Sequence, residues 1–219
     1  MSPSPRERPA ESAHGVRHGL FRGLFRGLLR GLALLRRRIA AANGWRRRTI
    51  AIACGVLAAA ALPPVHAVPL LIPAFAGLLW LLDGCRRRTW RAGFAVGWWF
   101  GCGHFAAGLY WVAASMLVQP EKFAWMIPFA VFGLAAGFAL FIGLVTLVTV
   151  LSRTNGIGRV LFLAAAWTAG EWLRGWIFTG FPWNLLGTVW VFSDGMIQLT
   201  ALTGVWGLSI LTVVVMAMP

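Results

Sequence analysis

Long apolar runs separated by short polar or basic segments dominate the chain from about residue 49 to its end. Most of these runs approach the roughly 20 residues that a helix needs to cross the hydrocarbon core of a bilayer. Because backbone groups inside lipid must bond to one another, and because period-two alternation is absent, the runs predict helices. The fold class is therefore all-α, a polytopic transmembrane helix bundle of about six spans. We expect these spans at residues 49–62, 65–82, 92–118, 123–151, 160–178 and 196–218.

The segments between the runs predict the orientation of this bundle. Arginines cluster before the first run and in the segments after the second and fourth runs. The alternate segments hold only His66 and Lys122 as basic residues. Because basic loops stay on the cytoplasmic side, the N-terminus is expected in the cytoplasm. Segments 63–66, 119–122 and 179–195 are then expected outside.

Residues 1–47 form a basic extension, which we treat as a region separate from the bundle at 48–219. Its first 13 residues are rich in Pro, Ser and Glu and are predicted to be disordered. A repeat of period four follows, GLFRGLFRGLLRGLALLRRR, which in a helix aligns glycines in one stripe and arginines in another. Two interpretations stay open: an amphipathic helix lying on anionic lipid, or a low-complexity basic segment without a fixed role.

Composition agrees with a membrane protein and narrows the function classes. Hydrophobic residues make up 59% of the chain and charged residues only 12%, more apolar surface than one soluble core hides. The net charge of +14 is concentrated in residues 6–48 and in short loops, so we exclude nucleic acid as a partner. Cys54, Cys85 and Cys102 show neither disulfide pairing nor metal spacing and are interpreted as small buried hydrophobes. No metal and no cofactor are predicted.

Glycines recur at every fourth position in two of the runs, at Gly93, Gly97 and Gly101 and again at Gly133 and Gly137. This spacing lets neighbouring membrane helices approach closely, so both stripes are expected at helix contacts. The spacing carries little functional information beyond packing.

Glu171 and Arg174 stand out because ionisable side chains are expensive inside a membrane. Being three residues apart, they share one face of a helix. One interpretation is a local ion pair, in which each side chain makes the burial of the other tolerable. The second interpretation is a headgroup or substrate site near the outer leaflet, where Arg174 binds phosphate and Glu171 orients it.

The next segment, Phe181-Pro182-Trp183-Asn184, is aromatic, although external loops are usually polar. It predicts a loop that dips into the headgroup layer or lines a lipid cleft, or else a simple aromatic anchor at the interface. Trp111, beside Tyr110 and Ser115, is expected near the same outer face, whereas His104 is interpreted as a packing residue. No GxSxG, HExxH or P-loop motif is present, so no catalytic residue is predicted in this chain. The candidate lipid or substrate cleft comprises Glu171, Arg174, Phe181, Trp183, Asn184 and Trp111.

Four blocks of the sequence resemble the apolipoprotein N-acyltransferases. EWLRGWIFTGFPWNLLG (171–187) is similar to that family's E-x-L-R-G-W-x-x-T-G-F-P-W segment and is the most specific of the four. GLYWVAAS (108–115) resembles the outer end of the family's third helix. ALPPVHAVPLLIPAFAGLLWLL (61–82) resembles its first helical hairpin, and LTALTGVWGLSILTV (199–213) its sixth helix. The resemblance covers roughly residue 48 to the end, in the family's order.

The resemblance implies an enzyme of the bacterial inner membrane that completes lipoprotein maturation. Such an enzyme moves a fatty acyl chain from a phospholipid acyl donor to the α-amino group of a diacylglyceryl apolipoprotein acceptor, surrounded by membrane lipids. In the family, a cysteine thiolate accompanied by a glutamate base and a lysine forms a thioester intermediate. These residues lie in a nitrilase-like domain outside the membrane.

The family's catalytic domain follows a seventh helix, whereas this chain ends just after its sixth apolar run. None of the three cysteines matches the nucleophile, and Glu171 belongs to the membrane motif rather than to the catalytic domain. We therefore expect the N-terminal membrane part of the enzyme, inactive by itself. A small polytopic transporter or a non-catalytic membrane scaffold stays an alternative, although no repeat of the hydropathy pattern favours transport.

Overall fold

A computed structural model describes residues 26–85, 90–177 and 180–218. Residues Met1–Arg38 and Ile39–Pro219 form two compact units, and each is described by itself. In the described ranges every regular element is a helix and no strand occurs, which confirms the all-α prediction. The predicted disorder of residues 1–13 and the first seven residues of the basic repeat, 19–25, lie outside the described residues.

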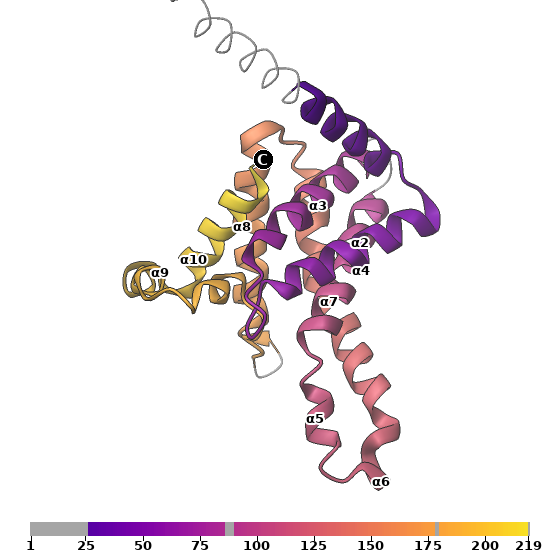
Figure 1. Cartoon of the computed structure of the whole chain (residues 1–219), viewed down its shortest axis with the longest axis vertical. Coiled ribbons are helices and arrows are strands. Elements are labelled where there is room, and N and C mark those ends of the chain that lie inside the picture. The colour runs from indigo at the N-terminus through magenta and orange to yellow at the C-terminus, as the bar shows by residue number, and fades with distance from the viewer. Residues whose placement is uncertain (1–25, 86–89, 178–179, 219) are drawn as a thin grey trace, which may run out of the picture. The chain divides into compact units, whose positions relative to one another are not determined.

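Each predicted apolar run overlaps one long helix, although α2, α4 and α8 begin before their runs and α3 ends after its run (Figure 1). The long helices are α2 (Gly44–Ala60), α3 (Leu71–Cys85), α4 (Trp90–Gly108), α7 (Ile127–Leu151), α8 (Gly156–Arg174) and α10 (Thr200–Ala217). The short elements between them are η1 (Val68–Leu70), α5 (Val112–Met116), α6 (Pro120–Phe123), η2 (Ala124–Met126), η4 (Leu186–Trp190) and α9 (Asp194–Gln198). A further helical stretch at 26–40 precedes α2.

Three stretches of the described helices are long and apolar enough to cross a membrane: Val68–Cys85, Pro120–Leu151 and Thr200–Ala217. The other long helices are more polar. Helix α8 carries Arg159, Glu171 and Arg174, and α2 has Arg46, Arg47 and Arg48 near its beginning. The spanning role of these helices, and hence the count of about six, stays a prediction.

The third apolar run differs from the prediction, which extended one span to residue 118. Helix α4 ends at Gly108, the chain turns at 109–111, and the short α5 follows. A distant segment packs at this break, since a side chain at Gly108 would collide with the side-chain amide of Asn184. The sixth run is also divided, into α9 and α10, and Gly204 inside α10 is non-helical at φ 66°. An apolar pattern does not reveal either break.

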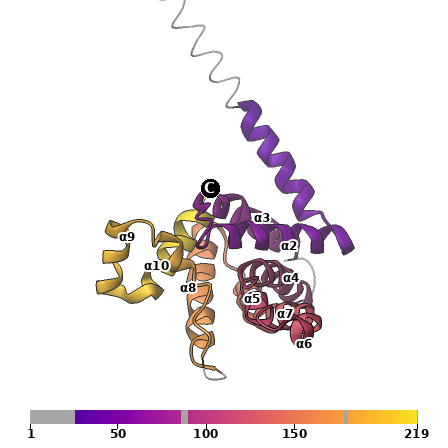
Figure 2. The ribbon, with the colours of Figure 1, turned by 60° about the horizontal axis from the view of Figure 1, so that its bottom comes forward.

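Helix α4 packs between α2 and α7 (Figures 1 and 2). The glycine stripe of α4 faces α7: a Cβ on Gly101 would lie 2.7 Å from the Cα of Ala139. The predicted close approach is thus confirmed for this stripe. It is wrong for Gly133 and Gly137, where a Cβ would meet no atom within 4 Å. These two glycines line an apolar groove of about 440 Å³ between α7 and α8.

The two glycine stripes should respond oppositely to an added methyl group. Gly101→Ala is expected to destabilise the bundle by about 1–3 kcal/mol, because α4 and α7 would have to separate. Gly137→Ala is the matched control on α7 and should be neutral or stabilising by up to about 1 kcal/mol, since helical glycine is entropically unfavourable. Unfolding in mixed micelles with increasing dodecyl sulfate, followed by circular dichroism, measures both. Equal effects would contradict the assigned contacts.

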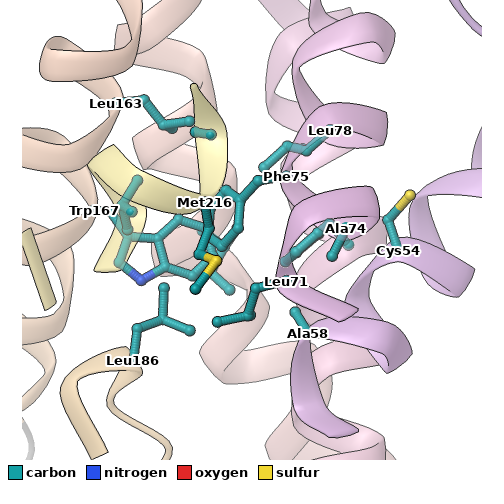
Figure 3. Packing of buried hydrophobic residues seen from close by; sticks show 14 of the residues in the cluster. Cys54, Ala58, Leu71, Ala74, Phe75, Leu78, Leu163, Trp167, Leu186 and Met216 are labelled. Atoms are coloured by element: carbon teal, nitrogen blue, oxygen red, sulfur yellow. The ribbon is translucent and has the colours of Figure 1, made fainter. Parts of the chain in front are cut away.

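Aromatic packing holds α8 against the rest of the bundle. The ring of Trp167 on α8 lies 5.2 Å from that of Phe75 on α3 and 5.9 Å from that of Phe100 on α4. Met216 of α10 and Leu186 of η4 close the same cluster (Figure 3). Four distant segments thus meet around Trp167. This packing sets the position of the last turns of α8, where Glu171 and Arg174 lie.

An ion pair ties the first turn of α8 to the end of α3. The guanidinium group of Arg159 donates to the carboxylate of Asp83, and it also donates to the carbonyl oxygen of Leu79 at 3.4 Å. Arg159 is buried, so its charge needs this partner. The pair lies at the opposite end of α8 from Arg174, roughly 22 Å away at 1.5 Å per residue.

Candidate functional site

The last two turns of α8 carry buried polar side chains on one face. Glu171 and Arg174 are only 5% and 3% exposed, and Thr168 is buried beside them. A buried ionisable group is tolerated only when other groups satisfy it. The partners come mainly from the segment that follows α8, at residues 181–186.

Arg174 holds the aromatic segment by its backbone. Its Nη1 atom donates to the carbonyl oxygen of Phe181 at 3.1 Å and to that of Trp183. The guanidinium carbon also lies 5.0 Å from the ring centre of Phe105 and 5.9 Å from that of Phe138. Cation–π attraction and charge-assisted hydrogen bonds are both stronger in a dry environment. Arg174 therefore clamps the chain reversal after α8.

Glu171 holds the beginning of η4. Its Oε1 atom accepts a hydrogen bond from the indole nitrogen of Trp167 at 3.0 Å and from the backbone N–H of Leu186 at 2.9 Å. Trp167 lies one turn earlier on the same helix, so its donor orients the carboxylate. The second donor comes from a separate element and joins η4 to α8.

The direct ion pair considered for Glu171 and Arg174 is not found among the ion pairs of the described residues. The two side chains instead bind different parts of the following segment. The physical reason is that this segment offers two carbonyl groups to the cation and a backbone N–H to the anion. The spacing in the sequence favours an ion pair between Glu171 and Arg174, because it reveals only which residues are neighbours on one helix.

A small cavity with several polar groups in its lining lies beside Arg174, between helices α4, α7 and α8. Its volume is about 10 Å³, close to the minimum of about 10–15 Å³ that one water molecule needs. His104, Glu171, Arg174 and Asn184 are among its lining residues. Among the described residues, His104 Nδ1, Glu171 Oε2 and Asn184 Nδ2 are buried and have no hydrogen-bond partner. Three side chains around this cavity thus hold unused hydrogen-bonding capacity.

The sequence predicts that His104 is a packing residue. The structure shows this packing and, in addition, a place for His104 in the lining of the small cavity. Its ring is 1% exposed and lies 5.1 Å from Phe105 and 6.4 Å from Phe100. It packs between aromatic rings as expected. It also contributes to the polar cavity, which connects it to Glu171 across helices α4 and α8.

A second and larger pocket, of about 570 Å³, is lined by Trp111 and Trp183 among others and is called the outer pocket below. The rings of Trp111 and Trp183 lie 5.3 Å apart on its wall, and they are 42% and 54% exposed. Both indoles therefore remain available to a ligand. The lining residues come from three segments: Leu62, Pro63, Pro64, Gly108, Tyr110, Trp111, Pro182, Trp183, Asn184 and Thr188.

Five of the six candidate residues thus fall into two layers. Trp111 and Trp183 line the outer pocket, whereas Glu171 and Arg174 line the inner cavity, and Asn184 lines both. Asn184 adopts a left-handed backbone conformation at φ 55°, which asparagine tolerates better than most residues. Phe181 belongs to neither pocket, because its ring stacks on Phe138 at 4.5 Å and fastens the segment to α7.

The arrangement is suited to binding rather than to covalent chemistry. Aromatic and apolar walls with a few polar groups are typical of pockets for small apolar ligands. Cys54, Cys85 and Cys102 line neither of the two pockets. In the part of the chain that the structure describes, no group of three or more His, Cys, Asp or Glu side chains is placed to hold a metal ion.

Several contributors were missed from the sequence. Pro63 and Pro64 were assigned only to a turn, and Thr188 was not considered. Nothing in the pattern places these residues beside Trp183. Trp167 was detectable, because a donor four residues before a buried glutamate lies on the same helix face.

Comparison with known proteins places the chain in a family. The family model described as the apolipoprotein N-acyltransferase N-terminal domain matches residues 54–218. A protein of Allorhizobium ampelinum named apolipoprotein N-acyltransferase is 44% identical over 83% of this chain and 36% of its own length. Proteins of the same name from Rhodopseudomonas palustris and Brucella melitensis are 42% and 40% identical, over 80% and 86% of this chain and 33% and 37% of theirs. The chain thus spans about a third of the length of these relatives. The matched region contains both layers of the site, and the chain belongs to the apolipoprotein N-acyltransferase family.

Proposed function

We propose that the chain forms the membrane part of an apolipoprotein N-acyltransferase of the bacterial inner membrane. The whole enzyme would transfer a fatty acyl chain from a phospholipid to the N-terminal diacylglyceryl-cysteine of a lipoprotein. The observation that carries the proposal is the aromatic pocket between Trp111 and Trp183. It is built by the segment that carries the family's most specific motif, and its apolar walls suit a lipid chain.

The orientation proposed from the basic segments agrees with this assignment. The N-terminal side of α2 would face the cytoplasm, as would the beginning of α8 with Arg159. The pocket then lies on the outer side, because it adjoins the opposite end of α8. Lipoprotein acceptors would reach it from the outer leaflet.

Within this proposal, Glu171 and Arg174 are positioning residues. Arg174 is buried, and its bonds go to the carbonyl oxygens of Phe181 and Trp183, so it supports the pocket wall from behind. These contacts favour this role over direct binding of a phosphate by Arg174. Trp111 and Trp183 would contact the lipid, and Asn184 would connect the two layers.

No residue of this chain is proposed to be catalytic. The nucleophile, the base and the lysine belong to the family's nitrilase-like domain, and the described cysteines lie away from the pocket. The 219-residue chain by itself is therefore expected to bind lipid without transferring it.

Photo-crosslinking tests the pocket directly. The chain in nanodiscs would be exposed to a phospholipid, and separately to a diacylglyceryl lipopeptide, each carrying a photoactivatable acyl chain. Labelling of the 108–111 and 182–188 segments, measured by mass spectrometry, is expected to fall up to about tenfold in Trp183→Ala, because an aromatic wall is lost.

Trp125→Ala is the matched control, since Trp125 is 67% exposed but lies outside the pocket. It should leave labelling of both segments unchanged. Equal labelling in the two variants would refute the pocket as a lipid site. The same samples, given donor and acceptor together, should yield no acylated lipopeptide, and acylated product would refute the inactivity of the isolated chain.

A further inference from the structure

The helical stretch at 26–40 separates charge from apolar surface. At 100° per residue, Arg26, Arg30 and Arg37 fall within about 40° of one another. Leu28, Leu32, Leu35 and Ile39 gather on the opposite side, within about 60°. Arg36, Arg38, Leu29 and Leu34 fall between these two faces, so the stretch is amphipathic with mixed flanks.

The leucines of this apolar side are exposed, whereas Ile39 at the end of the helix packs against the core of the bundle. Leu28, Leu32 and Leu35 are 61%, 44% and 47% exposed. The stretch contains five arginines and no acidic residue. A helix with exposed leucines on one face and arginines on the other fits a surface that combines an apolar interior with negative charge.

Chain connectivity limits where that partner lies. Only residues 41–43 separate the helix from α2, which begins at Gly44 and carries Arg46, Arg47 and Arg48. In the predicted topology, in which α2 spans the membrane, the basic beginning of α2 lies at the membrane surface on the cytoplasmic side. Because this linker is so short, the C-terminal end of the 26–40 helix is held close to that surface.

We propose that residues 26–40 form an interfacial helix that binds the anionic phospholipid surface of the cytoplasmic leaflet. The leucine face enters the boundary between headgroups and acyl chains, and the arginine face stays in water, close enough to the anionic headgroups to be attracted by their surface potential. This role is independent of acyl transfer, so it would stand even if the proposed function failed. Of the two interpretations that the sequence leaves open for the extension, the proposal selects the amphipathic helix on anionic lipid over the basic segment without a fixed role.

The test uses the full chain in nanodiscs of phosphatidylcholine alone or with 30% phosphatidylglycerol. An environment-sensitive fluorophore is attached at Leu32→Cys or, as the opposite-face control, at Arg37→Cys, with half-buried Cys102 replaced by serine. In the anionic discs, lipid-borne quenchers should quench the label at 32 and leave the label at 37 in water. Equal water exposure of the two labels would overturn the proposal. Shielding at 32 without quenching by lipid would also overturn it, since a protein would then be the partner.

A charge variant tests the anionic requirement. Each arginine near an anionic surface favours binding by roughly fivefold. The variant Arg26→Gln, Arg30→Gln and Arg37→Gln should thus lower the ratio of bound to free helix about a hundredfold in anionic discs. In phosphatidylcholine discs the same variant should change nothing. Full shielding of position 32 in the triple variant in anionic discs would refute the electrostatic part of the proposal.

Discussion

Replacing Arg174 with alanine is expected to lower the free energy of unfolding by about 2–5 kcal/mol. The change leaves the carbonyl oxygens of Phe181 and Trp183 without their buried donor. It also removes the cation packed over the rings of Phe105 and Phe138. Because the released segment forms the wall of the outer pocket, lipid labelling of residues 182–188 should fall in parallel.

Two further substitutions give this prediction its controls. Arg174→Lys keeps the charge but loses the planar donor geometry, so its stability should lie between wild type and alanine. Arg46→Ala removes an exposed arginine and should change the free energy of unfolding by no more than about 0.5 kcal/mol. Unfolding by dodecyl sulfate in mixed micelles measures all three. If Arg174→Ala leaves both stability and lipid labelling unchanged, Arg174 does not position the segment.

Replacing Glu171 with leucine is expected to destabilise the bundle by about 2–4 kcal/mol. Leucine has a similar size, but the indole N–H of Trp167 and the backbone N–H of Leu186 lose their shared acceptor. An unsatisfied buried donor costs about 1–3 kcal/mol, although hydrogen bonds inside membranes often contribute less than that. The loss should appear in the same unfolding experiment.

Glu171→Gln separates the acceptor from the charge. Glutamine can keep its side-chain oxygen on both donors, so a loss below about 1 kcal/mol is expected. The carboxylate makes no direct ion pair with Arg174 among the described contacts, which is why neutralising it should matter less than removing the acceptor. A glutamine variant as unstable as the leucine variant would show that the charge, rather than the acceptor, holds η4.

The sequence was most informative where the physical cause is local. Apolar runs near membrane length predict helices because lipid offers the backbone no partners, and each run overlaps one long helix. The motif at 171–187 pointed to the right family because it combines charged residues with aromatic ones in a fixed order. The stripe at Gly93, Gly97 and Gly101 was correctly placed at a helix contact.

The sequence was less informative where the cause lies in another segment. Gly133 and Gly137 have the same spacing as the α4 stripe, yet they face a groove, because no atom of the described residues lies within 4 Å of where their side chains would begin. The third run breaks at Gly108, where Asn184, 76 positions later, packs against the backbone. A periodic pattern identifies a face but does not say what covers it.

The amino-acid order by itself determined the helical class, the position of the long helices and the family of the chain. It also identified Glu171, Arg174 and the Phe181–Asn184 segment as unusual. Only the tertiary structure decided that the two charged side chains bind the segment rather than each other. It also decided that Trp111 and Trp183 share a pocket with Pro63 and Pro64, whereas Phe181 turns inward. The reason is that burial and hydrogen bonding depend on neighbours far apart in the chain, and packing alone brings them together.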